Sequence, residues 1–213
     1  MSVAGDKYKA ERGGLGEIVK IVIQALLIAV IVRTFLFQPF NIPSGSMKAT
    51  LLVGDYIFVS KFSYGFSRYS LPFSPDLFTG RIFATPPKRG DVAVFRLPRD
   101  PSFDYIKRVI GLPGDRISIH DGKVFVNDVA LTEPYIAAPP AYRYPQGTEN
   151  GVYVVPEAHV FVLGDNRNNS QDSHGANFGA VSLDSIIGQA FFIYLPLDDA
   201  GIIPHHRYSE LGE

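Results

Sequence analysis

Ser44, Gly45 and Ser46 place two hydroxyl groups one residue apart, directly after an apolar run and before a strand-like segment. A serine hydroxyl becomes an effective nucleophile when a neighbouring base removes its proton. Glycine and serine also favour turns, so the same stretch is compatible with an ordinary loop. The two serines therefore indicate nucleophilic catalysis only if the chain also supplies a base.

Histidine is the usual base for a serine nucleophile, but none of the histidines in this sequence lies in a familiar catalytic motif. No HExxH motif or comparable ligand spacing occurs, so a metal site is not expected. The last two histidines lie in what the sequence presents as a polar tail. The histidines are His120, His159, His174, His205 and His206.

A lysine in apolar surroundings is the alternative base, because burial disfavours the ammonium form and lowers the lysine pKa. In "DYIKRVIGLPGD" an extended strand places Tyr105, Lys107 and Val109 on one face and Arg108 on the other. A pKa of about 8 would leave roughly one lysine in ten neutral at pH 7. Lys107 is therefore the candidate base, and an ordinary solvated strand lysine is the competing interpretation.

The apolar run in front of the serines predicts a membrane anchor. Residues 18–37 are about twenty in number and would span ~30 Å as a helix, which is the thickness of a hydrocarbon core. A cleaved signal peptide is the alternative, but the run is too long and no small-x-small cleavage site follows it. Positive charges in front of the run predict a cytoplasmic N-terminal segment (1–17) and an outward-facing remainder (38–213).

The remainder of the chain reads as a mainly β domain. Short apolar alternations recur between turn signals, and Asp121-Gly122 between two of them is a strong hairpin signal. We therefore expect an antiparallel β-barrel-like domain with insertions at 63–89 and 132–150. The predicted strands are Asp55–Lys61, Asp91–Leu97, Tyr105–Gly111, Arg116–His120, Lys123–Val126, Gly151–Val155, His159–Gly164 and Gly188–Leu195.

The composition excludes several functional classes. A net charge of -1 and scattered basic residues give no footprint for nucleic acid. The absence of cysteine removes disulfides, thiolate zinc sites and cysteine nucleophiles together. The aromatic residues of insertion 63–89 either lie in the lipid interface or form a satellite core beneath a long loop.

Three motifs occur in a fixed order behind the anchor: "PSGSMKATLLVGDYIFVSKFSYG", "KRGDVAVFRLPRDPSFDYIKRVIGLPGD" and "GDNRNNSQDSHGANFG". Together they resemble the bacterial type I signal peptidases, also called leader peptidases. The resemblance covers most of residues 38–195. It implies a serine endopeptidase with a Ser-Lys dyad, in which Ser46 is the nucleophile and Lys107 the general base.

The resemblance also implies roles for residues around the dyad. The Ser44 hydroxyl and the Ser46 backbone N–H would form the oxyanion hole. Ser170 matches the residue that hydrogen-bonds and orients the lysine, and Asp172 matches a supporting acidic position. Ile42 and Ile106 match residues that line the pocket for small substrate side chains.

Two positions depart from the family pattern. The family usually has proline where this chain has Ala49, and we expect Ala49 only to loosen the turn. It commonly has arginine where this chain has His174, which puts a fixed ion pair with Asp172 in doubt. A charge contact between Asp172 and Arg108 could replace that pair.

The implied substrates are preproteins, cleaved after small residues of the Ala-x-Ala type by an enzyme of the bacterial inner membrane. Contact with membrane phospholipid, a monomeric state and the absence of any cofactor or metal are also expected. Two alternatives stay open. One is a Ser-Lys peptidase specialised for a single substrate, and the other is a catalytically inert, membrane-tethered β module that binds partners through its aromatic loops.

Overall fold

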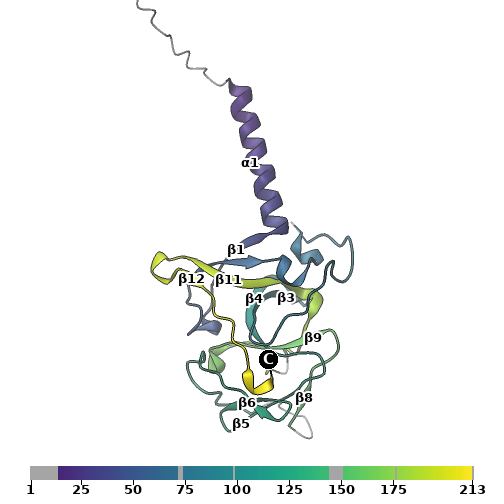
Figure 1. The fold of residues 1–213 in the computed structure, drawn as a ribbon, viewed down its shortest axis with the longest axis vertical. Helices are drawn as coiled ribbons and strands as arrows, with labels where there is room; N and C mark the ends of the chain where they lie inside the picture. The colour runs from purple at the N-terminus through teal and green to yellow at the C-terminus, as the bar shows by residue number, and fades with distance from the viewer. Residues whose placement is uncertain (1–13, 72–73, 98, 144–150, 176, 213) are drawn as a thin grey trace, which may run out of the picture.

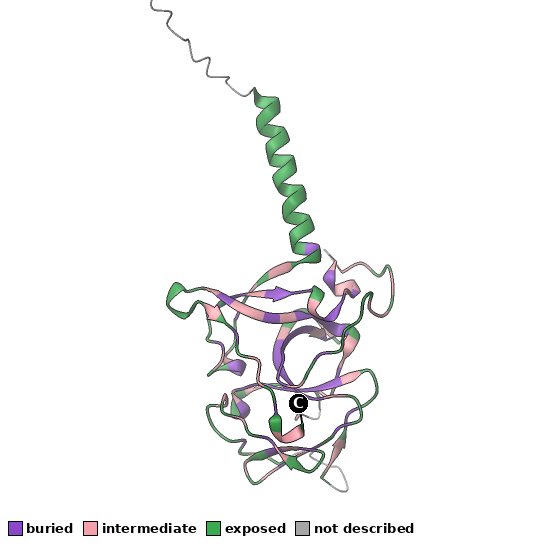
Figure 2. Ribbon diagram, in the orientation of Figure 1, coloured by how far each residue is buried: buried purple, intermediate pink, exposed green. Residues whose placement is uncertain are grey.

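The computed structural model describes residues 14–71, 74–97, 99–143, 151–175 and 177–212, and it shows one long helix standing on a β body (Figure 1). The helix, α1 (Leu15–Phe35), is long and apolar enough to cross a membrane, and only Thr34 within it is buried (Figure 2). It ends before the predicted boundary at residue 37. Pro39 disfavours a longer helix, because in a continued helix its ring would clash with the carbonyl of Phe35, four residues earlier. Residues 1–13 of the predicted cytoplasmic segment lie outside the described residues.

The body contains two antiparallel sheets, as the mainly β prediction requires. The larger sheet has the strand order β1-β2-β11-β3-β4-β9-β10, and β12 pairs with β11. Its strands are β1 (Phe37–Asn41), β2 (Tyr56–Ser60), β3 (Val92–Leu97), β4 (Asp100–Gly111), β9 (His159–Leu163), β10 (Val181–Ser182), β11 (Ile186–Leu195) and β12 (Gly201–Ile202).

The smaller sheet has the order β7-β6-β5-β8. The predicted hairpin at Asp121-Gly122 joins its two central strands, and both turn residues have positive φ, as a type I′ turn demands. The strands are β5 (Arg116–His120), β6 (Lys123–Val126), β7 (Val129–Ala130) and β8 (Tyr153–Val154).

The two sheets share buried residues, so the body forms one unit. Ile110 and Phe161, from β4 and β9 of the larger sheet, pack in one cluster with Ile117 and Val124 of the smaller sheet. A second cluster contains Met47, which follows the candidate nucleophile in the chain. The purple buried segments in Figure 2 follow the strands toward the interior of the body. The core thus reaches the turn that carries Ser46.

All eight predicted strands are present, whereas β1, β7, β10 and β12 were not predicted. Strand β1 begins directly after the helix and contains Pro39, which is unfavourable in a strand, and the other three have two residues each. A two-residue strand carries no readable alternation.

The prediction of a polar C-terminal tail is wrong. Ile203 and Tyr208 are fully buried, and the tail packs against the body. His205 accepts a hydrogen bond from the Val92 N–H at 3.2 Å. The buried residues stand singly among polar neighbours, so no periodic signal marks them in the sequence.

Insertion 63–89 has features of both a satellite core and a surface that could face lipid. Tyr64 is buried in a cluster with Phe95, and the Phe66 ring makes an edge contact with Phe35 at the end of α1. In contrast, Phe83 is 83% exposed and Ile82 is also exposed. One part of the insertion therefore packs against the body, and another part presents apolar side chains to the surroundings.

Candidate active site

The structure brings Ser46 and Lys107 together. Ser46 lies in the 3-10 turn Gly45–Met47, and Lys107 lies on β4. The Lys107 Nζ donates a hydrogen bond to the Ser46 Oγ at 2.8 Å and a second to the Ile106 carbonyl at 2.9 Å. Ser46 is 8% exposed and Lys107 is 3% exposed. A candidate nucleophile and a candidate base thus face each other away from bulk water.

Burial determines the charge state of the lysine. It lowers the pKa of Lys107 to about 8, against the opposing influence of the Asp172 and Asp165 carboxylates. At neutral pH a minor but substantial fraction of the side chain is therefore neutral. Such an amine has a free lone pair with which to accept a proton from Ser46. The prediction that strand alternation directs Lys107 to an apolar face agrees with this geometry.

The turn around Ser46 places further hydrogen-bond donors. The Ser44 Oγ lies 3.4 Å from the Ser46 Oγ, at the exposed edge of the site. Ser46 belongs to the first turn of its 3-10 helix, and the first N–H groups of a helical turn have no acceptor within it. The Ser46 N–H and the Ser44 hydroxyl are therefore placed to meet an oxyanion formed at the serine.

Asn166 holds the serine turn in place, a role that the sequence analysis missed. Its backbone N–H donates to the Ser46 carbonyl at 3.0 Å, and its side-chain amide donates to the Gly45 carbonyl at 2.9 Å. Both bonds reach across the molecule to the chain on either side of the candidate nucleophile. The only signal in the sequence was the position of Asn166 within the third motif.

Gly164 allows the third motif to approach Ser46 closely. A Cβ atom at this position would lie 2.3 Å from the Ser170 Oγ and 2.5 Å from the Ser46 carbonyl oxygen. No side chain fits at these distances, so only glycine is compatible with the contact. Ser170 thus lies next to the serine turn. Its Oγ is buried and has no hydrogen-bond partner in the part of the chain that the structure describes, so the expected bond to Lys107 is not present.

Asp172 is fully buried. Its carboxylate contacts nearby residues of the chain instead of forming an ion pair with Arg108. One carboxylate oxygen accepts the Gly164 N–H at 2.8 Å, and the other lies 2.6 Å from the His174 Nδ1. The His174 ring also stacks on Tyr142 at 4.0 Å between centroids. Although His174 replaces the arginine of the family pattern, the shorter side chain still reaches the Asp172 carboxylate through a hydrogen bond.

The partner of Arg108 is Asp165, so the suggested Arg108–Asp172 contact is also wrong. Both side chains are fully buried, and two guanidinium nitrogens bond the two carboxylate oxygens at 2.9 and 2.7 Å. Thr50, which follows the serine turn, donates its hydroxyl to Asp165 at 2.5 Å. The Arg108 guanidinium lies 4.0 Å above the Tyr135 ring. This pair connects the serine turn to the core.

Ala49 does more than loosen the turn. Its φ is 103°, a left-handed value that is strained for a residue with a side chain. Proline, the usual residue of the family at this position, has φ fixed near −65° and cannot adopt this conformation. The departure at Ala49 therefore goes with a different backbone path directly after Ser46 and Met47.

Ile42 and Ile106 lie in the same buried cluster as Met47, at 3% and 8% exposure. The two predicted pocket residues are thus brought together next to the dyad. A cavity of about 500 Å³ is lined in part by Tyr105, Ser170, Asp172 and His174, but not by Ser46, Lys107, Ile42 or Ile106.

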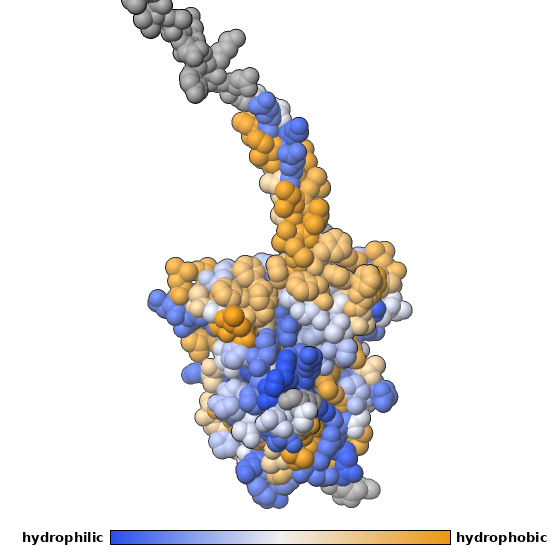
Figure 3. Space-filling view, in the orientation of Figure 1, coloured by the Kyte–Doolittle hydropathy of each residue, from blue (hydrophilic) through white to orange (hydrophobic). Residues whose placement is uncertain are grey.

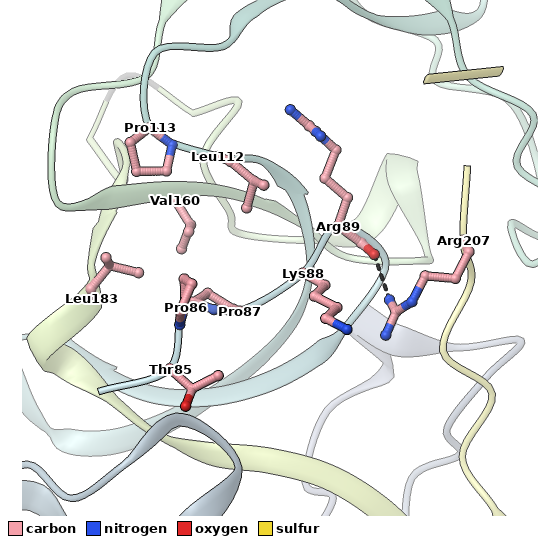
Figure 4. A pocket seen from close by; sticks show the side chains of 10 residues that line it. All are labelled: Thr85, Pro86, Pro87, Lys88, Arg89, Leu112, Pro113, Val160, Leu183 and Arg207. Atoms are coloured by element: carbon pink, nitrogen blue, oxygen red, sulfur yellow. Dashed lines mark hydrogen bonds between the residues drawn. The ribbon is translucent and has the colours of Figure 1, made fainter. Parts of the chain in front are cut away.

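A separate cavity of about 630 Å³ contains none of the candidate catalytic residues. Figure 4 shows its apolar wall, with Leu112, Pro113, Val160 and Leu183, and a basic rim on the opposite side. Within that rim Arg207 donates a hydrogen bond to the Arg89 carbonyl at 2.6 Å. The size of this cavity does not make it the catalytic site, because neither Ser46 nor Lys107 lines it.

Comparisons with known proteins identify the family of the chain. Residues 15–195 match the family described as signal peptidase, peptidase S26. The chain is 39% identical to signal peptidase I of Rickettsia typhi, with 84% of this chain and 81% of that protein aligned. It is 42% identical to signal peptidase I of Rickettsia conorii, over 79% of this chain and 75% of that protein.

A solved signal peptidase I from Enterococcus faecalis V583 is 33% identical to the chain, with a TM-score of 0.43. The match covers 49% of this chain and 97% of that structure. The sequence relationships define the protein as a serine endopeptidase. The chain belongs to the signal peptidase family, peptidase S26, whose function is the removal of signal peptides from preproteins.

Proposed function

We propose that this protein removes signal peptides through a Ser46–Lys107 dyad. The observation that carries the proposal is the 2.8 Å hydrogen bond between the Lys107 Nζ and the Ser46 Oγ, made by a lysine that is 3% exposed. A buried neutral amine at this distance is a competent base for a serine hydroxyl.

The chemistry follows from these two groups. Neutral Lys107 accepts the Ser46 proton as the Oγ attacks the scissile carbonyl carbon. The Ser46 N–H and the Ser44 hydroxyl stabilise the oxyanion of the tetrahedral intermediate. The C–N bond then breaks, Lys107 returns the proton to the leaving amine of the mature protein, and an ester remains on Ser46. Lys107 next deprotonates a water molecule, which hydrolyses the ester and releases the signal peptide.

The proposed substrate is an extended peptide that adds to the edge of β4. Strand β9 pairs with β4 only from Arg108 onward, so the edge opposite β3 ahead of Arg108 carries no strand in the described chain. A peptide on this edge would form main-chain hydrogen bonds beside Lys107. Ile42 and Ile106 would limit the space for its side chains, which supports cleavage after Ala-x-Ala sequences.

Membrane anchoring by α1 is the third part of the proposal. Figure 3 shows apolar surface over the end of the body nearest the helix, where the β11–β12 hairpin and the loop after β2 lie. Ile202 of β12 is 80% exposed, and Phe83, in the loop after β2, is also exposed. This surface supports lipid contact by the body in addition to the helix. We place the enzyme as a single-pass protein of the inner membrane, acting as a monomer without a metal, with its body on the extracytoplasmic side.

The activity of the dyad is expected to depend on pH. Because burial lowers the pKa of Lys107 to about 8, the base is mostly protonated at pH 6 and mostly neutral at pH 9. We expect kcat/KM for a preprotein to rise about tenfold per pH unit below the pKa and to level off above it. A pH–rate profile of the full chain in detergent measures this. A flat profile between neutral and mildly alkaline pH would exclude a lysine base.

The breadth of specificity separates a general processing enzyme from a peptidase with one substrate. We expect cleavage of several unrelated preproteins whose signal peptides end in Ala-x-Ala. Replacing the residue before the scissile bond by a bulky one should reduce cleavage by at least about 100-fold, because the site would have to accept a clashing side chain. A panel of purified preproteins, followed by gel mobility, tests this. Cleavage of a single member would favour the specialised peptidase.

A further inference from the structure

A small polar cavity lies where α1 meets the body. Its volume is about 210 Å³. The lining includes three cationic side chains and no carboxylate. The lining residues are Arg33, Gln38, Lys61, Tyr69, Leu71, Ser74, Arg96 and Ile187. Such a cavity is chemically suited to an anion.

Lys61 forms the buried side of this cavity. It follows β2 and is 2% exposed, and its Nζ donates a hydrogen bond to the Ser70 carbonyl at 2.5 Å. Burial, and then the charge of Arg33, lowers the pKa of Lys61 to about 8. No carboxylate offsets either effect. A buried cation without a counter-charge is costly, so a bound anion would stabilise it.

Arg33 and Arg96 complete the cationic set in different ways. Arg96 is already neutralised, because it forms an ion pair with Asp104 at 2.7 Å. Arg33, in the last turn of α1, is exposed and makes no ion pair or hydrogen bond with any residue that the structure describes. The positive charges of Arg33 and Lys61 are therefore left uncompensated at the same cavity. Two cations fit one phosphate group.

The position of the cavity at the end of α1 favours a lipid phosphate over a free anion as its ligand. Arg33 is two residues from the end of α1, and the apolar surface around the helix end would lie in the membrane boundary. Phospholipid phosphates occupy that level, and basic residues at the end of a membrane helix attract anionic headgroups. This step relies on the proposed anchoring by α1.

We propose that this cavity binds the phosphate group of an anionic phospholipid, with Arg33 and Lys61 neutralising its charge. Through Lys61, which follows β2, and Arg33 on α1, the bound headgroup would connect the helix to the larger sheet. The ligand chemistry is that of a phosphate ester, and the lipid and free phosphate are distinguished by experiment.

The test uses the full chain in a neutral detergent. Short-chain phosphatidylglycerol is titrated and its Kd is measured from the rise in Tm, in parallel with short-chain phosphatidylcholine and inorganic phosphate. Arg33→Gln and Lys61→Met should each weaken phosphatidylglycerol binding about fivefold, as expected for one basic residue. The matched control is Arg143→Gln, an exposed arginine that lies 3.6 Å from Asp121 and does not line the cavity. It should change the Kd less than twofold.

Saturable binding of phosphatidylglycerol that depends on Arg33 and Lys61 supports the proposal. Equal binding of inorganic phosphate would overturn the lipid as ligand and assign a free-phosphate site. Equal effects of all three substitutions would show diffuse surface attraction and overturn the site itself, as would no binding. Arg33 is exposed, so its variant keeps the test valid if Lys61→Met does not fold. Preprotein cleavage and recovery in the membrane fraction, measured separately, show whether the dyad or the anchoring fails instead.

Discussion

Replacing Lys107 by methionine is expected to abolish preprotein cleavage, with kcat reduced at least about 10⁴-fold. Methionine fills a similar volume but has no amine to accept the Ser46 proton. The 2.8 Å bond between Nζ and Oγ would be lost, and no histidine contacts Ser46 among the hydrogen bonds of the described chain. Single-turnover cleavage of a preprotein by the full chain in detergent measures the loss.

Ser46→Ala should cause a loss of the same size, because the dyad acts as a unit and either partner alone is ineffective. Lys123→Met and Ser118→Ala, on the smaller sheet, are the control substitutions and should leave cleavage within twofold of the parent. If both dyad variants were folded and still cleaved at the parental rate, the catalytic assignment would be wrong. The inert binding module would then be the better interpretation.

The Lys107 substitution also makes a prediction about stability. A folded-state pKa of about 8, below the unfolded value of 10.5, means that the unfolded chain binds more protons between these pH values. Stability from this group is therefore lowest below pH 8 and is regained as the pH rises toward 10.5. Lys107→Met removes this penalty, which is at most about 3 kcal/mol at neutral pH. An inactive Lys107→Met variant that is at least as stable as the parent would show that cleavage is lost because the base is missing, and not because the protein unfolds.

The features that could be predicted are those with a local signal. Strand alternation placed Lys107 on an apolar face, and Asp121-Gly122 specified a hairpin, because a period of two and a positive-φ turn are written in neighbouring residues. Three motifs in order located Ser46, Lys107 and the loop that carries Ser170. The position of Lys107 in the sheet also depends on the strand register, which pairs Ala93 of β3 with Lys107 of β4.

The features that could not be predicted depend on contacts between distant residues. Alternation correctly sends Arg108 to the face opposite Lys107, but it does not say that Asp165 meets it there, 57 residues later. The bonds from Asn166 to the serine turn are equally distant in sequence. The positive φ of Ala49 is also unmarked in the sequence, because alanine does not favour a left-handed conformation. The propensities of neighbouring residues predict neither the two long-range contacts nor the φ of Ala49.

Asp165→Asn is expected to destabilise the protein by about 3–5 kcal/mol, because it leaves the Arg108 guanidinium buried without its counter-charge. Both side chains are fully buried, so water cannot replace the lost carboxylate. The shape is kept, and one acceptor oxygen remains for Thr50. The variant therefore tests charge rather than volume. Thermal unfolding of the full chain in detergent, followed by the near-ultraviolet circular dichroism of its tyrosines, should show a Tm lower by ~10 °C.

The matched control is Asp76→Asn, which removes the carboxylate from the exposed Arg68–Asp76 pair, with exposures of 37% and 75%. Solvent screening limits such a pair to about 1 kcal/mol or less, so the Tm should hardly move. Because Thr50 joins Asp165 to the serine turn, Asp165→Asn should also lower kcat at temperatures where the chain is still folded. Equal effects of the two substitutions would contradict this account, since they would mean that the buried pair contributes no more than a surface contact.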